Sequence, residues 1–184
     1  RGLGDVYKRQ AGISLGDAIA SLFAVIGTMA ALNEKQNSGK GQEVDVAIYE
    51  AVFALMESTI ADFELGGHIR GRTGSILPGV APSNVYPTAD GANVLIAGNA
   101  DAIFGRICEA MQQPALAEDP RYVDHEHRGA NQEELDELIG AWTATFPVDD
   151  LEALLDQHAI PYGRIFTAPD MLSDPQFAAR ELIK

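Results

Sequence analysis

Glycine and proline gather in the middle of this 184-residue chain, and they constrain its fold more than any other feature. Residues 66–84 contain five glycines and two prolines. Both residue types interrupt helices and strands, so we predict an irregular connection over 66–84 with a domain boundary inside it. A connection of that length is usually a linker or a functional loop.

The part of the chain before this connection has the pattern of an α/β unit. Residues 15–36 predict a helix, because apolar side chains recur with its period at Leu15, Ile19, Leu22, Phe23, Ile26 and Ala30. A turn cluster at 37–41 ends the helix, and residues 43–48 alternate polar and apolar like a half-buried strand. Residues 49–65 predict a second helix.

The part after the connection predicts a small α+β domain. Two short strands, at 84–88 and 93–97, flank the turn Asp90-Gly91 and form a hairpin. A helix that starts at Gly98–Asp101 and runs to about residue 112 follows. The remaining predicted elements are helices at 131–145 and 148–158, a strand at 162–166 and a helix at 167–172.

Charge and cysteine content exclude several classes of function. The net charge is −14, with 13 basic and 27 acidic residues, which argues against a nucleic-acid partner. A single cysteine, Cys108, excludes an internal disulfide and fits a reducing, cytoplasmic location. The apolar run 19–32 is too short to span a membrane.

The first ten residues are predicted to have a different origin from the rest. The string DVYKRQ, residues 5–10, resembles the translation of a transposase adapter used in preparing sequencing libraries. We therefore interpret residues 1–10 as an artefact and exclude them from fold reasoning. The natural protein is then expected to extend upstream, and the chain is expected to be a fragment.

Asp17 is the first candidate for chemistry, with two interpretations. It stands three residues after Ser14, the spacing of a capped helix start, which would give it a purely structural role. A carboxylate at a helix N-terminus is also stabilised in its ionised form and can serve as a nucleophile. Local sequence does not decide between the two.

Three further groups of residues could carry chemistry. Gly98 and Asn99, between a strand and a helix, could present backbone N–H groups to an oxyanion, or they could form an ordinary capped turn. Arg70 and Arg72 could contact a carboxylate or phosphate, or be solvated loop charges. His125 and His127 are two residues apart in a polar loop without further ligands, so no metal site is predicted.

Segments along residues 11–184 resemble the class III CoA-transferase family, which includes formyl-CoA and carnitine CoA-transferases. A G-x-S-x-G-D turn at 12–17, a helix of small and apolar residues, and an S-G-K-G-Q-x-V-D segment at 38–45 follow one another as in that family. The later segments RTGSILPGVAPSNVYPTADG, GNADAIFGRIC, DPRYVDHEHRGANQEEL and HAIPYGRIF are also similar to it.

The resemblance implies a mechanism and assigns residues to it. Asp17 matches the aspartate that forms acyl anhydride and aspartyl-CoA thioester intermediates, and Gly98 and Asn99 match the start of a loop that closes over it. Family members often have more glycines in that loop, and Ala100 departs from the pattern. The substrates would be an acyl-CoA and a carboxylic acid, with no permanently bound cofactor.

The family fold is a Rossmann-like large domain followed by a small domain, in an interlocked homodimer. Residues 11–65 would then end the first large-domain section, 66–80 would be the linker, and 81–167 the small domain. Residues 168–184 would begin the return to the large domain.

Two alternatives remain open from the sequence. One is the racemase branch of the same family, which acts on 2-methylacyl-CoA thioesters and would use Asp17 with a histidine upstream of residue 11. The other is an inactive CoA-binding homologue.

Overall fold

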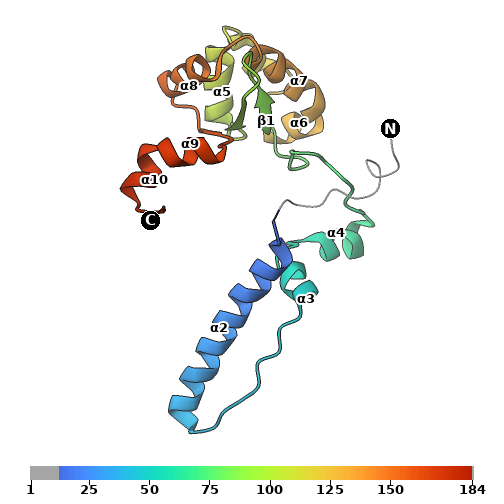
Figure 1. Cartoon of the computed structure of the whole chain (residues 1–184). Helices are drawn as coiled ribbons and strands as arrows, with labels where there is room; N and C mark the ends of the chain where they lie inside the picture. The colour runs from blue at the N-terminus through green and yellow to red at the C-terminus, as the bar shows by residue number, and fades with distance from the viewer. Residues whose placement is uncertain (1–12, 184) are drawn as a thin grey trace, which may run out of the picture. The chain divides into compact units, whose positions relative to one another are not determined.

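The computed structural model describes residues 13–183, whose contacts divide the chain into two units (Figure 1). Unit 1 is Arg1–Gly71 and unit 2 is Arg72–Lys184, and each is described by itself. The division falls inside the glycine- and proline-rich segment. The proposed adapter, residues 1–10, lies outside the described residues.

Unit 1 is dominated by helix α2, Leu15–Ser38, which confirms the helix predicted at 15–36 and extends it by two residues. The helix ends where Gly39 adopts a left-handed conformation (φ 74°) and its N–H donates to Lys35 O at 2.9 Å. Only glycine takes this conformation without steric cost, so the turn cluster ends the helix as predicted.

The predicted strand at 43–48 is absent, since residues 41–47 adopt no regular secondary structure. A strand needs a neighbouring strand for its backbone hydrogen bonds, and residues 13–71 contain no strand that could pair with this segment. The predicted helix at 49–65 is two helices, α3 Ile48–Phe53 and α4 Thr59–Gly66. Between them Glu57 has a positive φ of 52°, which interrupts the helix. The sequence gives no sign of this interruption, because residues 54–58 contain neither glycine nor proline.

Helix α2 is longer than the apolar run from which a membrane span was excluded. It has 24 residues with a mean hydropathy of 1.8, so by length and composition it could cross a membrane. The length argument from sequence is therefore wrong for this helix. Core helices of soluble proteins can have the same length and hydropathy. Within the described residues α2 has no buried side chain, and Leu22, Val25, Ile26 and Met29 are more than 60% exposed.

Unit 2 is built on a three-stranded antiparallel sheet in the order β1-β2-β3. Strands β1 Ser83–Pro87 and β2 Asn93–Ala97 form the predicted hairpin, and Gly91 in its turn has a φ of 84°. Strand β3 is Tyr162–Arg164. Val94 and Ile96 of β2 are fully buried while Leu95 between them is exposed, so one face of the sheet carries the core.

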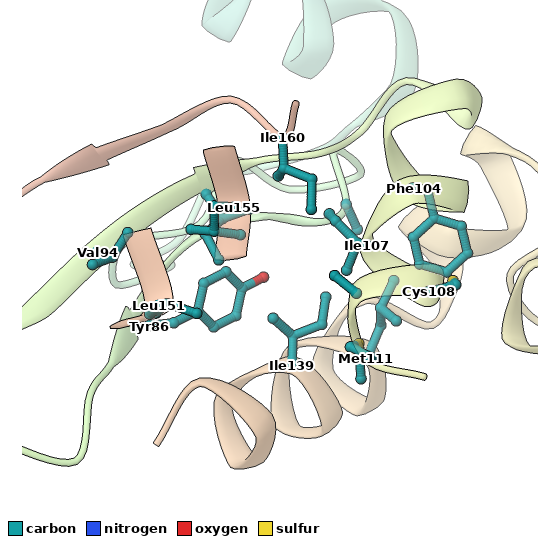
Figure 2. Close-up of a cluster of buried hydrophobic side chains, with 14 of the residues drawn as sticks. Tyr86, Val94, Phe104, Ile107, Cys108, Met111, Ile139, Leu151, Leu155 and Ile160 are labelled. Atoms are coloured by element: carbon teal, nitrogen blue, oxygen red, sulfur yellow. The ribbon is translucent and has the colours of Figure 1, made fainter. Parts of the chain in front are cut away.

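Helices α5 (Asp101–Ala110), α7 (Gln132–Thr143) and α8 (Val148–Gln157) lie around β1 in Figure 1, and each contributes buried side chains to that core. Figure 2 shows the Tyr86 ring among Leu151, Leu155 and Ile139, close to side chains from α5. The helical elements of unit 2 are α5 Asp101–Ala110, η1 Pro114–Glu118, α6 His125–Ala130, α7 Gln132–Thr143, α8 Val148–Gln157, α9 Ala168–Ser173 and α10 Pro175–Ala179.

The end of the predicted linker is fixed to unit 2. Gln132 at the start of α7 accepts a hydrogen bond from Gly79 N at 3.1 Å. Its amide nitrogen donates to Leu77 O at 3.2 Å and to Val80 O at 3.1 Å. Upstream, the Ser75 hydroxyl contacts Asn84 Oδ1 at 2.6 Å. Residues 75–80 are therefore held on unit 2.

We expect Gln132→Glu to destabilise unit 2 by about 1–3 kcal/mol, because a carboxylate would face two carbonyl oxygens and lose both donors. Urea unfolding of the whole chain, followed by the fluorescence of its single tryptophan, Trp142 in α7, measures this. Gln113→Glu makes the same chemical change at an exposed position and is the control. Equal midpoints for the two variants would contradict the anchoring role.

Candidate active site

Asp17 lies in the first turn of α2, and its side chain is exposed. The predicted cap is absent: Ser14 occupies the N-cap position but makes no side-chain capping hydrogen bond. Among residues 13–183, no hydrogen bond or ion pair reaches the Asp17 carboxylate, and the Ser21 hydroxyl contacts only its backbone oxygen, at 2.8 Å. The capping hydrogen bonds considered for Asp17 are therefore absent, and its role as a nucleophile stays a prediction.

Close packing beside Asp17 fixes the start of α2. A Cβ atom on Gly16 would lie 3.0 Å from Ile48 Cγ2 and 3.7 Å from Val52 Cγ2, both on α3. Glycine at this position lets the two helices approach closely. The backbone that carries Asp17 therefore rests on a second helix.

Gly98 ends the strand side of the predicted loop, between β2 and α5. Its N–H donates to Pro82 O at 2.8 Å, so this N–H is not an oxyanion donor in the observed conformation. A Cβ atom here would lie 2.2 Å from Ile107 Cδ1, and Ile107 is fully buried. A side chain at position 98 would therefore require Ile107 to move, so close packing favours glycine here, whereas the sequence suggested an oxyanion contact or a capped turn.

The next N–H groups are better placed. Among the described residues, those of Asn99, Ala100 and Asp101 donate to no protein acceptor. Ala100 is exposed, and helix α5 begins at Asp101. The first N–H groups of a helix have no partner within the helix and suit an anionic oxygen. The loop can therefore offer donors to an oxyanion from Asn99 onward.

Arg128 contacts this loop through Asn99, and the sequence did not identify it as a functional candidate. It is fully buried, although it lies in the polar stretch where a solvated loop was predicted. That stretch is helix α6, whose first turn is capped by Asp124 accepting from His127 N at 2.9 Å. No periodic pattern marks Arg128 as buried, and only its contacts identify it.

The guanidinium of Arg128 makes four hydrogen bonds. They go to Asn99 O (2.8 Å), Asp101 Oδ1 (2.6 Å), Tyr122 O (3.1 Å) and Ala81 O (3.2 Å). The group also lies 4.8 Å from the centre of the Phe104 ring. A buried charge is tolerated when it is paired and hydrogen-bonded in this way.

The two arginines considered for substrate contact lie at the joint between the units. Arg70 pairs with Asp62 at 2.8 Å, donates to the Ser58 hydroxyl at 2.6 Å and lies 3.7 Å from Glu57. Its hydrogen bond lowers the pKa of the Asp62 carboxyl. Arg70 therefore already has carboxylate partners within unit 1, and Arg72 also has an interaction partner.

Other reactive side chains do not form a site in the described part of the chain. Cys108 is buried in the core, and burial raises the pKa of its thiol to about 11, so it is a poor nucleophile at neutral pH. Residues 13–183 contain no group of three or more His, Cys, Asp and Glu side chains able to hold a metal ion.

The candidate residues are thus divided between the units. Asp17 and Arg70 belong to unit 1, and Gly98, Asn99 and Arg72 belong to unit 2. The structure brings Arg128 to Asn99, and it places Asp17 at a helix start where no other side chain among residues 13–183 binds its carboxylate.

An exposed carboxylate and a loop with backbone donors are groups of the kind that acyl transfer uses. The model of CoA-transferase family III matches residues 3–184, so the chain belongs to this family. The match begins within the segment interpreted as an adapter, whose origin remains a prediction.

Three curated relatives are CoA-transferases that use succinyl-CoA. The succinyl-CoA–D-citramalate CoA-transferase of Chloroflexus aurantiacus is 54% identical over 99% of this chain and 45% of the relative. The alpha subunit of the succinyl-CoA–L-malate CoA-transferase of Chloroflexus aurantiacus is 36% identical over 90% and 39%. The succinyl-CoA:mesaconate CoA-transferase of Haloarcula hispanica is 34% identical over 99% and 45%. The chain thus spans less than half the length of these relatives.

Solved structures agree with the fold. A CAIB/BAIF family protein from Brucella suis is similar with a TM-score of 0.75 and 30% identity, over 94% of this chain and 45% of that one. The Mycobacterium tuberculosis protein Rv3272 has a TM-score of 0.80 at 20% identity, over 99% and 47%, which supports the fold alone. The mixed α/β architecture is therefore that of the family.

Proposed function

We propose that the complete polypeptide transfers coenzyme A between carboxylic acids, with Asp17 as the nucleophile. The observation that carries this proposal is the exposed Asp17 carboxylate, which has no partner within residues 13–183 and stands at the start of α2 in a family member. A carboxylate engaged in capping would have to break that bond before reacting, and Asp17 has none to break.

The first half-reaction consists of two acyl exchanges. An Asp17 carboxylate oxygen attacks the thioester carbonyl of the donor, the C–S bond breaks, and an acyl-aspartyl anhydride and CoA thiolate result. The thiolate then attacks the aspartyl carbonyl, the anhydride C–O bond breaks, and the donor leaves as a free carboxylate. Asp17 now carries CoA as a thioester, so each exchange replaces one reactive acyl group with another.

The second half-reaction reverses these steps with the acceptor acid. The acceptor carboxylate attacks the aspartyl-CoA thioester, which releases the thiolate and forms a new mixed anhydride. The thiolate then attacks the acceptor's acyl carbon, and the Asp17 carboxylate is regenerated. No proton or electron is consumed overall, so no permanently bound cofactor is needed.

The loop from Gly98 to Asp101 would supply the hydrogen-bond donors that stabilise negative charge during the reaction. Each exchange passes through a tetrahedral oxyanion, and backbone N–H groups aimed at it stabilise it. We assign this role to the N–H groups of Asn99, Ala100 and Asp101, with Gly98 as the packed anchor of the loop. The loop would also exclude water, which would hydrolyse the anhydride. Arg70 and Arg72 are candidates for a substrate carboxylate or CoA phosphate, and each would have to exchange its present partner for that ligand.

The substrate class follows from the relatives. The three relatives above are named for succinyl-CoA and for citramalate, malate or mesaconate, all short dicarboxylates. We propose succinyl-CoA as donor and a four- or five-carbon dicarboxylate as acceptor. Because these relatives are transferases, transfer is favoured over the racemase and the inactive homologue.

The proposal includes the assembly expected from the sequence. Unit 1 would belong to a Rossmann-like large domain that covers the exposed apolar side chains of α2, in a cytoplasmic interlocked homodimer. The segment 41–47 would then gain the strand neighbour that it lacks among residues 13–71.

Isotope exchange tests the function. The complete polypeptide is incubated with succinyl-CoA and labelled citramalate, malate or mesaconate, and new CoA thioesters are separated by chromatography. We expect labelled acyl-CoA in proportion to released succinate. Release of free CoA without labelled thioester would identify a hydrolase and contradict the proposal.

A further inference from the structure

We infer that Arg128 is a positioning residue for the acyl-transfer loop, setting which way the Asn99–Ala100 peptide faces. The inference rests on the proposed function, because the loop matters only if it serves the reaction of Asp17. It is carried by the contacts of a guanidinium whose side chain is 1% exposed.

The argument begins with the Asn99–Ala100 peptide. The carbonyl oxygen of Asn99 accepts a hydrogen bond from Arg128 Nη2 at 2.8 Å, so it points into the protein. In a trans peptide the C=O and N–H bonds point in opposite directions. The Ala100 N–H therefore points away from Arg128, on the side where Ala100 is exposed. A rotated peptide would present a carbonyl oxygen to an oxyanion instead of a donor.

The same guanidinium holds both ends of the loop. Its Nη2 also contacts Asp101 Oδ1, in the first turn of α5, at 2.6 Å. Its Nε donates to Ala81 O, next to Pro82, whose oxygen accepts the Gly98 N–H. One planar group thus fixes the segments on either side of the donor N–H groups. Lysine has a single charged nitrogen and cannot span these acceptors.

The loop is therefore pre-organised. Gly98 is packed against Ile107, and Asn99 is held through its carbonyl oxygen. A fixed array of donors stabilises a developing oxyanion without reorganisation during the reaction. The departure from a glycine-rich loop at Ala100 is consistent with a loop whose shape is set by Arg128.

The test is Arg128→Lys in the complete polypeptide, assayed for transfer and for hydrolysis of the acyl-CoA. We expect kcat for transfer to fall about 10- to 100-fold, the scale of a small misplacement of catalytic groups, with KM for acyl-CoA within about twofold. The fraction of acyl-CoA lost to water should rise. This ratio distinguishes positioning from stability, because partial unfolding lowers active protein without changing the ratio.

Arg164→Lys is the matched control. Arg164 pairs with Asp149 and, at 2.6 Å, with Glu152, and neither partner belongs to the loop. This variant therefore measures the effect of weakening an arginine ion pair that does not contact the loop. We expect a lower melting temperature with unchanged partition between transfer and hydrolysis. If Arg128→Lys does not fold, Asp101→Ala decides, since Asp101 is 68% exposed. It should shift the partition in the same direction by a few fold.

The outcomes separate the two proposals. A wild type that transfers no CoA overturns the proposed function and the role of the loop with it. An active wild type whose folded Arg128→Lys or Asp101→Ala variant keeps its kcat and its hydrolysed fraction overturns the positioning role alone. A change of partition in Arg128→Lys, absent in Arg164→Lys, supports it.

Discussion

Replacing Asp17 by asparagine is expected to lower turnover of the complete polypeptide by roughly 10⁴-fold or more, the scale on which covalent nucleophiles matter. The amide has nearly the same size, so the exposed start of α2 should be unaffected and stability should change by less than about 1 kcal/mol. Mass spectrometry after incubation with acyl-CoA should detect a CoA thioester on the wild type and none on Asp17→Asn.

Glu34→Gln is the matched control for this experiment. Glu34 is an exposed carboxylate on the same helix, near its other end, and the change removes the same charge. Its turnover and adduct should equal those of the wild type. Full activity in Asp17→Asn would reject Asp17 as nucleophile, and an adduct retained by that variant would place the CoA on another residue.

Gly98→Ala is expected to destabilise unit 2 by about 1–3 kcal/mol, because its Cβ would collide with Ile107 Cδ1 at 2.2 Å inside a packed core. Ile107→Val removes that Cδ1 atom and should cost about 0.5–1.5 kcal/mol by itself. The double variant should be more stable than the sum of the single changes predicts. Urea unfolding monitored at Trp142 gives all three values.

This cycle separates steric fit from backbone freedom. If Gly98 were needed for an unusual backbone conformation, shortening Ile107 would rescue nothing. Gly105→Ala is the control. Gly105 lies on α5, the helix that carries Ile107, and a Cβ atom there meets nothing within 4 Å. We expect that change to stabilise α5 slightly, by up to about 1 kcal/mol. Additive effects of Gly98→Ala and Ile107→Val would contradict the packing explanation.

Local patterns predicted the elements whose causes are local. The period of apolar side chains identifies α2, and Asp90-Gly91 identifies the hairpin, in which the Asp90 carboxylate accepts from the Thr88 hydroxyl at 2.5 Å. The helix predicted at 167–172 is α9, and Thr167 at its N-cap forms a capping box with Asp170. In each case the residues that stabilise the element lie within a few positions of it.

Elements that depend on distant partners were predicted less well. Residues 43–48 alternate like a strand, but alternation supplies no neighbour to accept its hydrogen bonds. Arg128 belongs to a run of polar residues, and its burial results from carbonyl groups up to 47 positions away. Gly98 was found as a glycine at a strand-to-helix junction, but its reason, the position of Ile107, is tertiary.

The hydrogen bonds and ion pair made on either side of residues 71–74 also bear on how family members could be recombined. Asp62 holds Arg70 on one side, and Asn84 and Gln132 hold Ser75 and Gly79 on the other. A crossover placed within 71–74 would keep each of these networks within one parent. A crossover at 66–67 would take Arg70 from one parent and Asp62 from the other, and one at 80–81 would divide Gly79 from Gln132. In such a chimaera, the crossover that preserves these contacts therefore has to fall within the four residues 71–74.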